Sequence, residues 1–254
     1  MDAFRLDGQR ALVTGGSKGI GAGIARGLAE AGADIILMAR GQRELEKTRD
    51  ELRNTGQSIG IMACDLSQAD QMAACFADTE REHGAVDILV NNAGTTRRAP
   101  AHELSLEDWQ IVLDVNLTAA FGMSQAFARS RITAKKPGKI INIGSLMSST
   151  TRKDNAPYAA SKGGILLLTK ALAVDWAPHQ ILVNAIGPGF INTPMTKPLV
   201  DDPEFNEWVA DRCPAGRWGT PGDLAGAAVF LASPASNFVT GQMVYVDGGW
   251  LARF

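Results

Sequence analysis

The chain has 254 residues, of which 45% are hydrophobic and 27 are glycine. This is enough apolar sequence to bury one large core, and α/β domains of this length are often single. The formal net charge of −2 argues against a surface that binds polyanions, so no nucleic-acid partner is expected.

The cysteines, histidines and N-terminus indicate a cytoplasmic protein. Cys64, Cys75 and Cys213 are odd in number and widely spaced, which suits a reducing compartment better than a disulfide framework. The three histidines are scattered, so no metal site is expected. The N-terminus lacks the apolar segment of a signal peptide, and no apolar run approaches membrane-spanning length. We therefore expect a cytoplasmic protein without a membrane partner.

The first strand, glycine turn and helix form a phosphate-binding pattern. Residues 10–14, RALVT, predict a short strand that runs into GGSKGIG, and AGIARGLAEAG then has helical spacing. Glycines in such a turn let the backbone approach a pyrophosphate, and the helix N-terminus attracts its charge. The alternative is a tight turn with incidental glycines. We expect a dinucleotide to be bound here by Gly15, Ser17, Lys18, Gly19, Ile20 and Gly21.

The end of the second predicted strand, 32–39, indicates which dinucleotide is bound. An acidic residue at this place accepts from the ribose 2′-hydroxyl and selects NAD. This chain has Arg40 there, and Lys18 lies inside the glycine turn. Two cations and no carboxylate favour a 2′-phosphate, hence NADP, with NAD as the alternative. Both cations could also simply be solvated.

The alternation of strands and helices continues along the chain. It predicts further elements at 43–54, 58–64, 68–82 and 86–90. Asp65 follows the third strand, where it could accept from the adenine amino group or cap the next helix. This alternation implies right-handed crossovers and a parallel sheet covered on both faces. We find no linker, so a single domain over 1–254 is expected.

The second half supplies the remaining elements and a substrate side. Helices and strands are expected at 105–133, 139–143, 157–177, 181–186, 221–232 and 243–246. The irregular stretch from 194 to 217 is of a length that is usually functional or mobile in a compact domain. We expect a lid over the substrate at about 190–217, with a surface excursion as the alternative. Inward-facing side chains would be Met195, Leu199, Phe205 and Trp208.

A serine, a tyrosine and a lysine form a proton-transfer pattern. Tyr158 and Lys162 are four residues apart and share one helix face. A phenol has a reference pKa of ~10, and a buried ammonium beside it would lower that pKa. Ser145 could hold a carbonyl oxygen while Tyr158 passes it a proton. By itself the pattern is weak, because an amphipathic helix with a solvated lysine looks the same.

Taken together, these motifs resemble the short-chain dehydrogenase/reductase family over essentially the whole chain. TGGSKGIG resembles the glycine turn of that family, and NNAG matches its fourth-strand motif. The segment PGFINT at 188–193 resembles the one that holds the nicotinamide carboxamide. Four residues fall where the family keeps its catalytic tetrad, namely Asn116, Ser145, Tyr158 and Lys162. The resemblance implies further cofactor contacts from Asp65, Leu66, Asn92, Ala93, Gly94, Tyr158, Lys162, Pro188, Gly189, Ile191 and Thr193.

The resemblance also implies a fold and residue roles. The fold would be a Rossmann-like, doubly wound α/β sandwich of seven parallel strands, assembled as a homotetramer through helices 105–133 and 157–177. The chemistry would be hydride transfer at C4 of the nicotinamide. Tyr158 would act as general acid or base, with its pKa lowered by Lys162, which would also bind the nicotinamide ribose. Ser145 would polarise the carbonyl. Asn116 would kink its helix and hold a water that links Lys162 to solvent.

Three local details resemble one branch of the family, the gluconate 5-dehydrogenases and 2-deoxy-gluconate 3-dehydrogenases. They are Arg97-Arg98 after NNAG, the segment 214–233 and the ending 246–253. This likeness implies a sugar acid or its keto form. Several members of the branch carry an acidic residue where this chain has Arg40, a departure that favours NADP and leaves the substrate open. The expected substrate-binding residues are Ser145, Tyr158, Arg98 and Arg152, the arginines because they suit a carboxylate.

Two other functions remain open beside this main expectation of an NADP-dependent oxidoreductase for a gluconate-like substrate. One is a 3-oxoacyl-carrier-protein reductase, which would dock an acidic carrier protein on a group of basic residues. The alternative for these residues is that they are ordinary solvated cations at the C-terminus of a helix. The other is a sensor that binds NADP without turnover, against which the complete tetrad argues. The basic residues are Arg129, Arg131, Lys135, Lys136 and Lys139.

Overall fold

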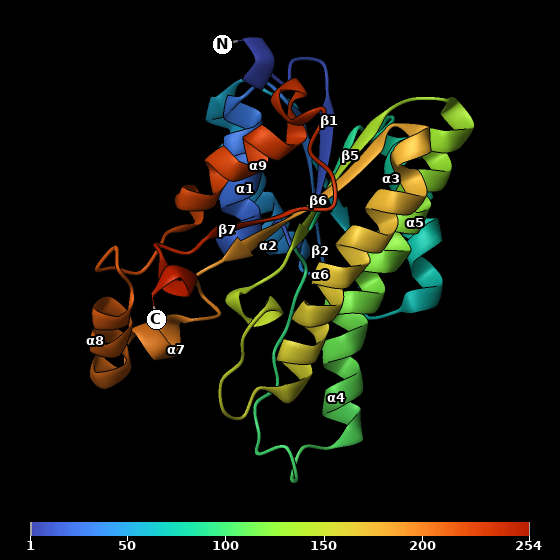
Figure 1. The fold of residues 1–254 in the computed structure, drawn as a ribbon. Coiled ribbons are helices and arrows are strands. Elements are labelled where there is room, and N and C mark those ends of the chain that lie inside the picture. The colour runs from blue at the N-terminus through green and yellow to red at the C-terminus, as the bar shows by residue number, and fades with distance from the viewer. Residues whose placement is uncertain (1, 254) are drawn as a thin grey trace.

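Seven parallel strands form one sheet in the computed structural model, which describes residues 2–253 (Figure 1). The strand order is β3-β2-β1-β4-β5-β6-β7, and every pairing is parallel. The order reverses direction between β1 and β4, which is the switch point where doubly wound sheets bind ligands. The expected fold class is confirmed. The strands are β1 (Arg10–Thr14), β2 (Asp34–Ala39), β3 (Ile59–Ala63), β4 (Ile88–Asn91), β5 (Gly138–Ile143), β6 (Ile181–Pro188) and β7 (Met243–Val246).

Helices cover both faces of the sheet, as the apolar strands require (Figure 1). Side chains of α1, α2 and α9 share one core cluster with strand residues such as Val13 and Leu37. Side chains of α3, α5 and α6 share the other with Leu12 and Met38, because successive strand residues point to opposite faces. The helices are α1 (Gly19–Glu30), α2 (Gln42–Leu52), α3 (Met72–His83), α4 (Leu106–Leu113), α5 (Ala119–Ala134), α6 (Ala156–Trp176), α7 (Lys197–Val200), α8 (Pro203–Arg212) and α9 (Ala225–Ala232).

The predicted helix 105–133 is continuous from Leu106 to Ala134 but contains a π-helical turn at Asp114–Thr118. Such turns often mark functional sites. By length and composition this run could cross a membrane, so the expectation that no apolar run approaches that length is wrong. Its most apolar window is 44% buried, and the run packs against α3 and α6. That packing is what a core helix of the layer requires.

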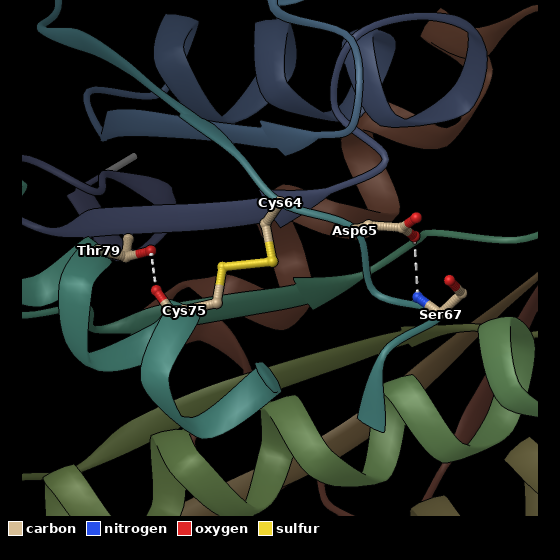
Figure 2. Close-up of a disulfide and its surroundings, with 5 residues drawn as sticks. All are labelled: Cys64, Asp65, Ser67, Cys75 and Thr79. Atoms are coloured by element: carbon tan, nitrogen blue, oxygen red, sulfur yellow. Dashed lines mark hydrogen bonds between the residues drawn. A yellow bond between two sulfur atoms is a disulfide. The ribbon is translucent and has the colours of Figure 1, made fainter. Parts of the chain in front are cut away.

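Cys64 and Cys75 form a disulfide, contrary to the expectation from their spacing (Figure 2). Cys64 follows β3 and Cys75 lies in α3, and their Cα atoms are 6.7 Å apart. Separations in this range allow a disulfide without movement of the backbone. Sequence spacing did not reveal this pairing, because it depends on how the start of α3 packs beside the end of β3. Cys213 is free and buried.

The helices α7 and α8 stand apart from the two layers, beside the C-terminal end of the chain (Figure 1). Asp202 caps α8 by accepting from the backbone N–H groups of Glu204 and Phe205. Of the side chains predicted to face inward, Met195 is 54% and Trp208 is 44% exposed. Met195 still lines the cleft described below, so it faces inward as expected. Trp208 nevertheless packs against Phe190, as described below.

Candidate active site

A cleft of about 820 Å³ opens where the strands end at the carboxyl edge of the sheet. Gly21, one predicted cofactor residue, lies buried beneath the glycine turn and does not line it. All the other predicted cofactor residues line the cleft, which brings together the segments after β1, β2, β3, β4 and β6. They are Gly15, Ser17, Lys18, Gly19, Ile20, Arg40, Asp65, Leu66, Asn92, Ala93, Gly94, Tyr158, Lys162, Pro188, Gly189, Ile191 and Thr193.

The glycine turn is held tightly against the end of β4. Asn92 donates from Nδ2 to the carbonyl oxygens of Thr14 at 2.9 Å and Gly15 at 3.1 Å. Gly15 has a φ of +62°, and a Cβ there would lie 2.8 Å from Asn92 Nδ2. A Cβ at Gly21 would meet the Gly15 carbonyl oxygen. No side chain fits in this cradle, so the N-terminus of α1 stays open to a pyrophosphate.

The ribose end of the cleft carries both cations expected from the sequence. Arg40 and Lys18 are exposed at its wall, and within residues 2–253 neither pairs with a carboxylate. Arg40, and not an acidic residue, follows β2 as expected, but Glu44 in the first turn of α2 also lines the cleft. Its carboxylate lies where a Cβ at Gly41 would sit. The signal for Glu44 was its place at a helix N-terminus, which attracts negative charge.

Asp65 does not cap the next helix, which begins further along the chain at Ala69. Its Oδ1 accepts from the backbone N–H of Ser67 at 3.0 Å, which closes a local turn (Figure 2). The same residue lines the cleft beside Leu66. These features of the cradle and the ribose end fit a phosphorylated dinucleotide: two free cations for the ribose end and open backbone N–H groups for the pyrophosphate.

Ser145 is fixed at the end of β5 with its hydroxyl hydrogen available. It caps a short 3₁₀ turn, Leu146–Ser148, where its Oγ accepts from the backbone N–H of Met147 at 3.1 Å. Ser148 accepts from the backbone N–H of Ser145 in return. Because the oxygen is engaged as an acceptor, the hydroxyl hydrogen can be donated to a carbonyl oxygen or to Tyr158.

Tyr158 and Lys162 lie one turn apart on α6, as predicted. The Lys162 ammonium is buried, donates to the Ile143 carbonyl oxygen at 2.7 Å, and lies 5.7 Å from the centre of the Tyr158 ring. Burial lowers the pKa of Lys162 to about 8. The hydrogen bond to Ile143 holds this ammonium toward the end of β5, rather than against the phenol hydroxyl.

The pKa of Tyr158 is raised, not lowered as expected from Lys162. Burial is the largest cause, and it is opposed by the hydrogen bond with Ser145 and by the charges of Arg98 and Arg152. The phenol is half-buried in the wall of the cleft, and its partial desolvation disfavours the phenolate more than these groups favour it. Tyr158 therefore remains protonated at neutral pH, which suits a general acid for ketone reduction.

We expect ketone reduction to be independent of pH from about 6 to 8 and to fall above about 8. Below its pKa of about 8 Lys162 is an ammonium, and above that pH the charge that supports the site is lost. The check is kcat/KM across this range at constant ionic strength. Lys162→Arg, which keeps its charge, should lose the fall near pH 8. A wild-type rate that rose between pH 6 and 8 would contradict this assignment.

Asn116 lies in the π-helical turn and links the segment after β4 to α6. Its Oδ1 accepts from the backbone N–H of Thr95 at 2.7 Å, and its Nδ2 donates to the Thr95 carbonyl oxygen and to Ser161 Oγ, both at 3.0 Å. The predicted irregularity of the helix at Asn116 is present. Its side chain is fully engaged with protein groups, so a bridging water would have to bind to the backbone of this turn.

The three candidate arginines differ in their partners. Arg97 lines the cleft, but its Nε is paired with Asp108 Oδ1 at 3.1 Å. Unlike Arg97, Arg98 and Arg152 do not line the cleft, although their charges act to lower the pKa of Tyr158. Burial, and then the charge of Arg98, lowers the pKa of Arg152, so the two guanidinium groups also repel each other. In the chain from 2 to 253 no carboxylate pairs with either one.

The aromatic cluster around Phe190 was missed by sequence reasoning. The Phe190 ring, just past β6, lies 4.6–5.9 Å from four other rings, measured between centroids. These rings come from α8, from the loop after it and from the C-terminal turn, so no local pattern announced them. They belong to Phe205, Trp208, Trp218 and Trp250.

Two of the five basic residues considered for carrier docking are engaged by the fold. Arg131 is buried, pairs with Asp87 at 3.1 Å and donates to the carbonyl oxygen of Pro137. Lys139 donates to Asn237 Oδ1 at 2.9 Å. Both residues lie near the amino end of β5, whereas Ser145 follows its carboxyl end. Two of the five cations thus serve the fold, at the edge of the sheet away from the cleft.

Comparison with known proteins agrees with this geometry. Residues 15–251 match a family model of short-chain dehydrogenases described as enoyl-(acyl carrier protein) reductase. Gluconate 5-dehydrogenase of Gluconobacter oxydans is 45% identical over 98% of this chain and 96% of its own. The 2-dehydro-3-deoxy-D-gluconate 5-dehydrogenase of Escherichia coli K12 is 44% identical over 100% and 99%. The crystal structure of gluconate 5-dehydrogenase from Burkholderia cenocepacia, in complex with NADP and tartrate, superimposes with a TM-score of 0.95, at 45% identity over 100% and 99%.

Proposed function

The chain belongs to the short-chain dehydrogenase/reductase family, and we propose that it interconverts a secondary hydroxyl and a ketone on a sugar acid with NADP as cofactor. It is an oxidoreductase by that membership. Relatives named for gluconate and deoxygluconate substrates at 44–45% identity support the substrate class. NADP in the complex of the Burkholderia enzyme supports the cofactor.

The pair of guanidinium groups near Tyr158 is the observation that supports an anionic substrate. Two like charges near each other raise the free energy of the site until an anion lies between or beside them. Arg98 and Arg152 are in this position, with no carboxylate partner among the residues described. A guanidinium presents paired N–H donors that match a carboxylate. A sugar acid would place its carboxylate there and its ketone between Ser145 and Tyr158.

The proposed mechanism assigns proton transfer to Tyr158 and polarisation to Ser145. NADP, when bound, supplies or accepts the hydride at its nicotinamide ring. In reduction the Tyr158 hydroxyl donates its proton to the carbonyl oxygen, while the Ser145 hydroxyl donates a hydrogen bond to the same oxygen. In oxidation the proton moves the other way. Lys162 holds positive charge behind the phenol, and Asn116 fixes the π-helical turn against α6.

The direct test is NADPH oxidation, with NADH in parallel, against 5-keto-D-gluconate, a neutral ketohexose and an acetoacetyl thioester. We expect the keto acid to be reduced with NADPH, and the other two poorly. Turnover of the thioester alone would overturn the sugar-acid proposal and favour a carrier-protein reductase. Binding of NADPH with no turnover of any panel member would favour a sensor.

We also propose a homotetramer, in line with the family resemblance. Apolar side chains of Leu117, Phe121 and Leu168 line a groove of about 470 Å³ between the α4–α5 run and α6. Leu167 and Val174, on α6, are among the most exposed large apolar residues of the described chain. Covering such a surface with a second copy is favourable by about 25 cal/mol per Å². Light scattering that returned a monomer would remove this proposal.

Two further proposals concern the chain as a whole. We propose one catalytic domain over 1–254 with a lid at about 190–217, supported by a cleft whose walls include Ile191, Thr193 and Met195. We also propose a cytoplasmic location, where NADPH would serve as reductant. The Cys64–Cys75 disulfide argues the other way, since disulfides are rare in reducing compartments. Cell fractionation would show whether the protein lies in the cytoplasm or in an oxidising compartment.

A further inference from the structure

Arg152 rests on two aromatic rings of the lid. Its guanidinium carbon lies 5.2 Å from the centre of the Phe205 ring and 6.0 Å from that of Phe190. A guanidinium at such distances from a ring face is attracted by the ring quadrupole. Phe190 follows β6 and Phe205 lies in α8, so this contact joins the substrate side of the site to the lid.

The contact with these rings opposes electrostatic repulsion of Arg152. The charge of Arg98 repels Arg152, and Arg152 is partly desolvated, so the free side chain would swing toward water. The charge of Arg152 still reaches Tyr158 in the observed position. Something must hold the guanidinium near both groups, and within residues 2–253 no carboxylate does so. The Phe205 and Phe190 rings lie against it.

The rings are themselves held by the aromatic cluster. The centroid of Phe190 lies 4.6 Å from that of Trp250 and 5.5 Å from that of Trp218. Phe205 lies 5.2 Å from Trp208, measured in the same way. Trp218 donates from Nε1 to Asn206 Oδ1 at 2.7 Å, which ties the loop after α8 to α8 itself. The position of Arg152 therefore depends on how α8 is seated.

We propose that Phe205 and Phe190 are positioning residues that hold Arg152 for the carboxylate of the substrate, so that the seating of α8 sets the preference for anionic over neutral substrates. This inference rests on the proposed function, because it assumes a substrate that carries a carboxylate. Neither phenylalanine needs to touch the reacting atoms. Their contribution is to keep a repelled, flexible cation in one place before the substrate arrives.

The test compares 5-keto-D-gluconate with its neutral methyl ester, using NADPH and the full-length protein. Phe205→Leu should lower kcat/KM for the acid about threefold to thirtyfold, mainly through KM, and leave the ester unchanged. Phe205→Tyr keeps a ring face and should keep the preference for the acid. In an Arg152→Gln background, Phe205→Leu should change the acid-to-ester ratio no further, since the two residues act as one unit.

Two controls separate positioning from general damage to the lid. Trp208→Leu removes a ring that contacts Phe190 and Phe205 but not Arg152. Arg212→Gln removes a guanidinium that lies over Trp250, 5.7 Å from its ring centre, in the same cluster. Arg212→Gln should leave the acid-to-ester ratio at its wild-type value, even where it lowers the melting temperature. Trp208→Leu should lower the ratio less than Phe205→Leu does, because it loosens the support of the two rings but removes neither ring from Arg152.

The outcomes distinguish this inference from the function on which it rests. A wild-type enzyme that reduces no keto-sugar acid overturns the proposed function. A wild-type enzyme that prefers the acid, with the same preference in Phe205→Leu, overturns the positioning role alone. So does an equal loss of the preference in Phe205→Leu and Trp208→Leu, because that result would mean that only the fold of the lid matters.

Discussion

Replacement of Tyr158 by phenylalanine should lower kcat for ketone reduction about 10²–10⁴-fold, the usual contribution of a positioned general acid. Ser145 acts to lower the pKa of Tyr158, but desolvation outweighs it and keeps the phenol protonated at neutral pH. Phenylalanine keeps the ring and its packing on α6 but removes the phenol proton that is transferred. The barrier should therefore rise without a comparable loss of stability.

The measurement is single-turnover NADPH oxidation with the keto-sugar acid, together with NADPH binding and a thermal melt of the same variant. Binding and melting temperature should stay close to wild type. Ser145→Ala is the informative partner, because removal of one oxyanion donor costs about 10²–10³-fold. The double variant should be little worse than Tyr158→Phe, since the two hydroxyls act on one oxygen. Activity of Tyr158→Phe within about tenfold of wild type would remove the acid role.

The convergence of Ser145, Tyr158 and Lys162 on one cleft could be predicted, because these residues lie at the ends of regular elements. Ser145 follows a buried apolar strand. Tyr158 and Lys162 lie one turn apart near the N-terminus of the helix that comes next in the chain. In a parallel sheet, the carboxyl end of that strand and the N-terminus of that helix must come together. The glycine turn could be predicted for the same reason, since strand, turn and helix are contiguous in sequence.

What could not be predicted depends on contacts between distant segments. Phe190, Trp218 and Trp250 meet in one cluster, yet each stands alone in its own stretch of sequence. Arg131 looked like one cation of a basic run and is instead buried against Asp87, 44 positions earlier by residue number. The raised pKa of Tyr158 depends on desolvation, which is a property of the packed site rather than of the Y-x-x-x-K spacing.

Arg40→Asp should shift the cofactor preference from NADPH toward NADH by about 1–3 kcal/mol, or roughly 5–150-fold in the ratio of affinities. Arg40 follows β2 at the wall of the cleft, and Lys18 lies in the glycine turn nearby. A 2′-phosphate would gain a charged hydrogen bond from Arg40, whereas an aspartate would repel it and accept from a free 2′-hydroxyl. Fluorescence titration with both cofactors measures the ratio directly.

Glu44 makes this experiment sharper, because it places a carboxylate on the same wall in the wild-type protein. If the 2′-phosphate lies between Arg40 and Glu44, Glu44→Gln should tighten NADPH and leave NADH nearly unchanged. Salt should weaken NADPH binding more in the wild type than in Arg40→Asp, since screening acts on the phosphate–guanidinium attraction. A cofactor ratio that stays the same in Arg40→Asp would mean that Arg40 is solvated and that Lys18, with the backbone of the turn, selects the cofactor.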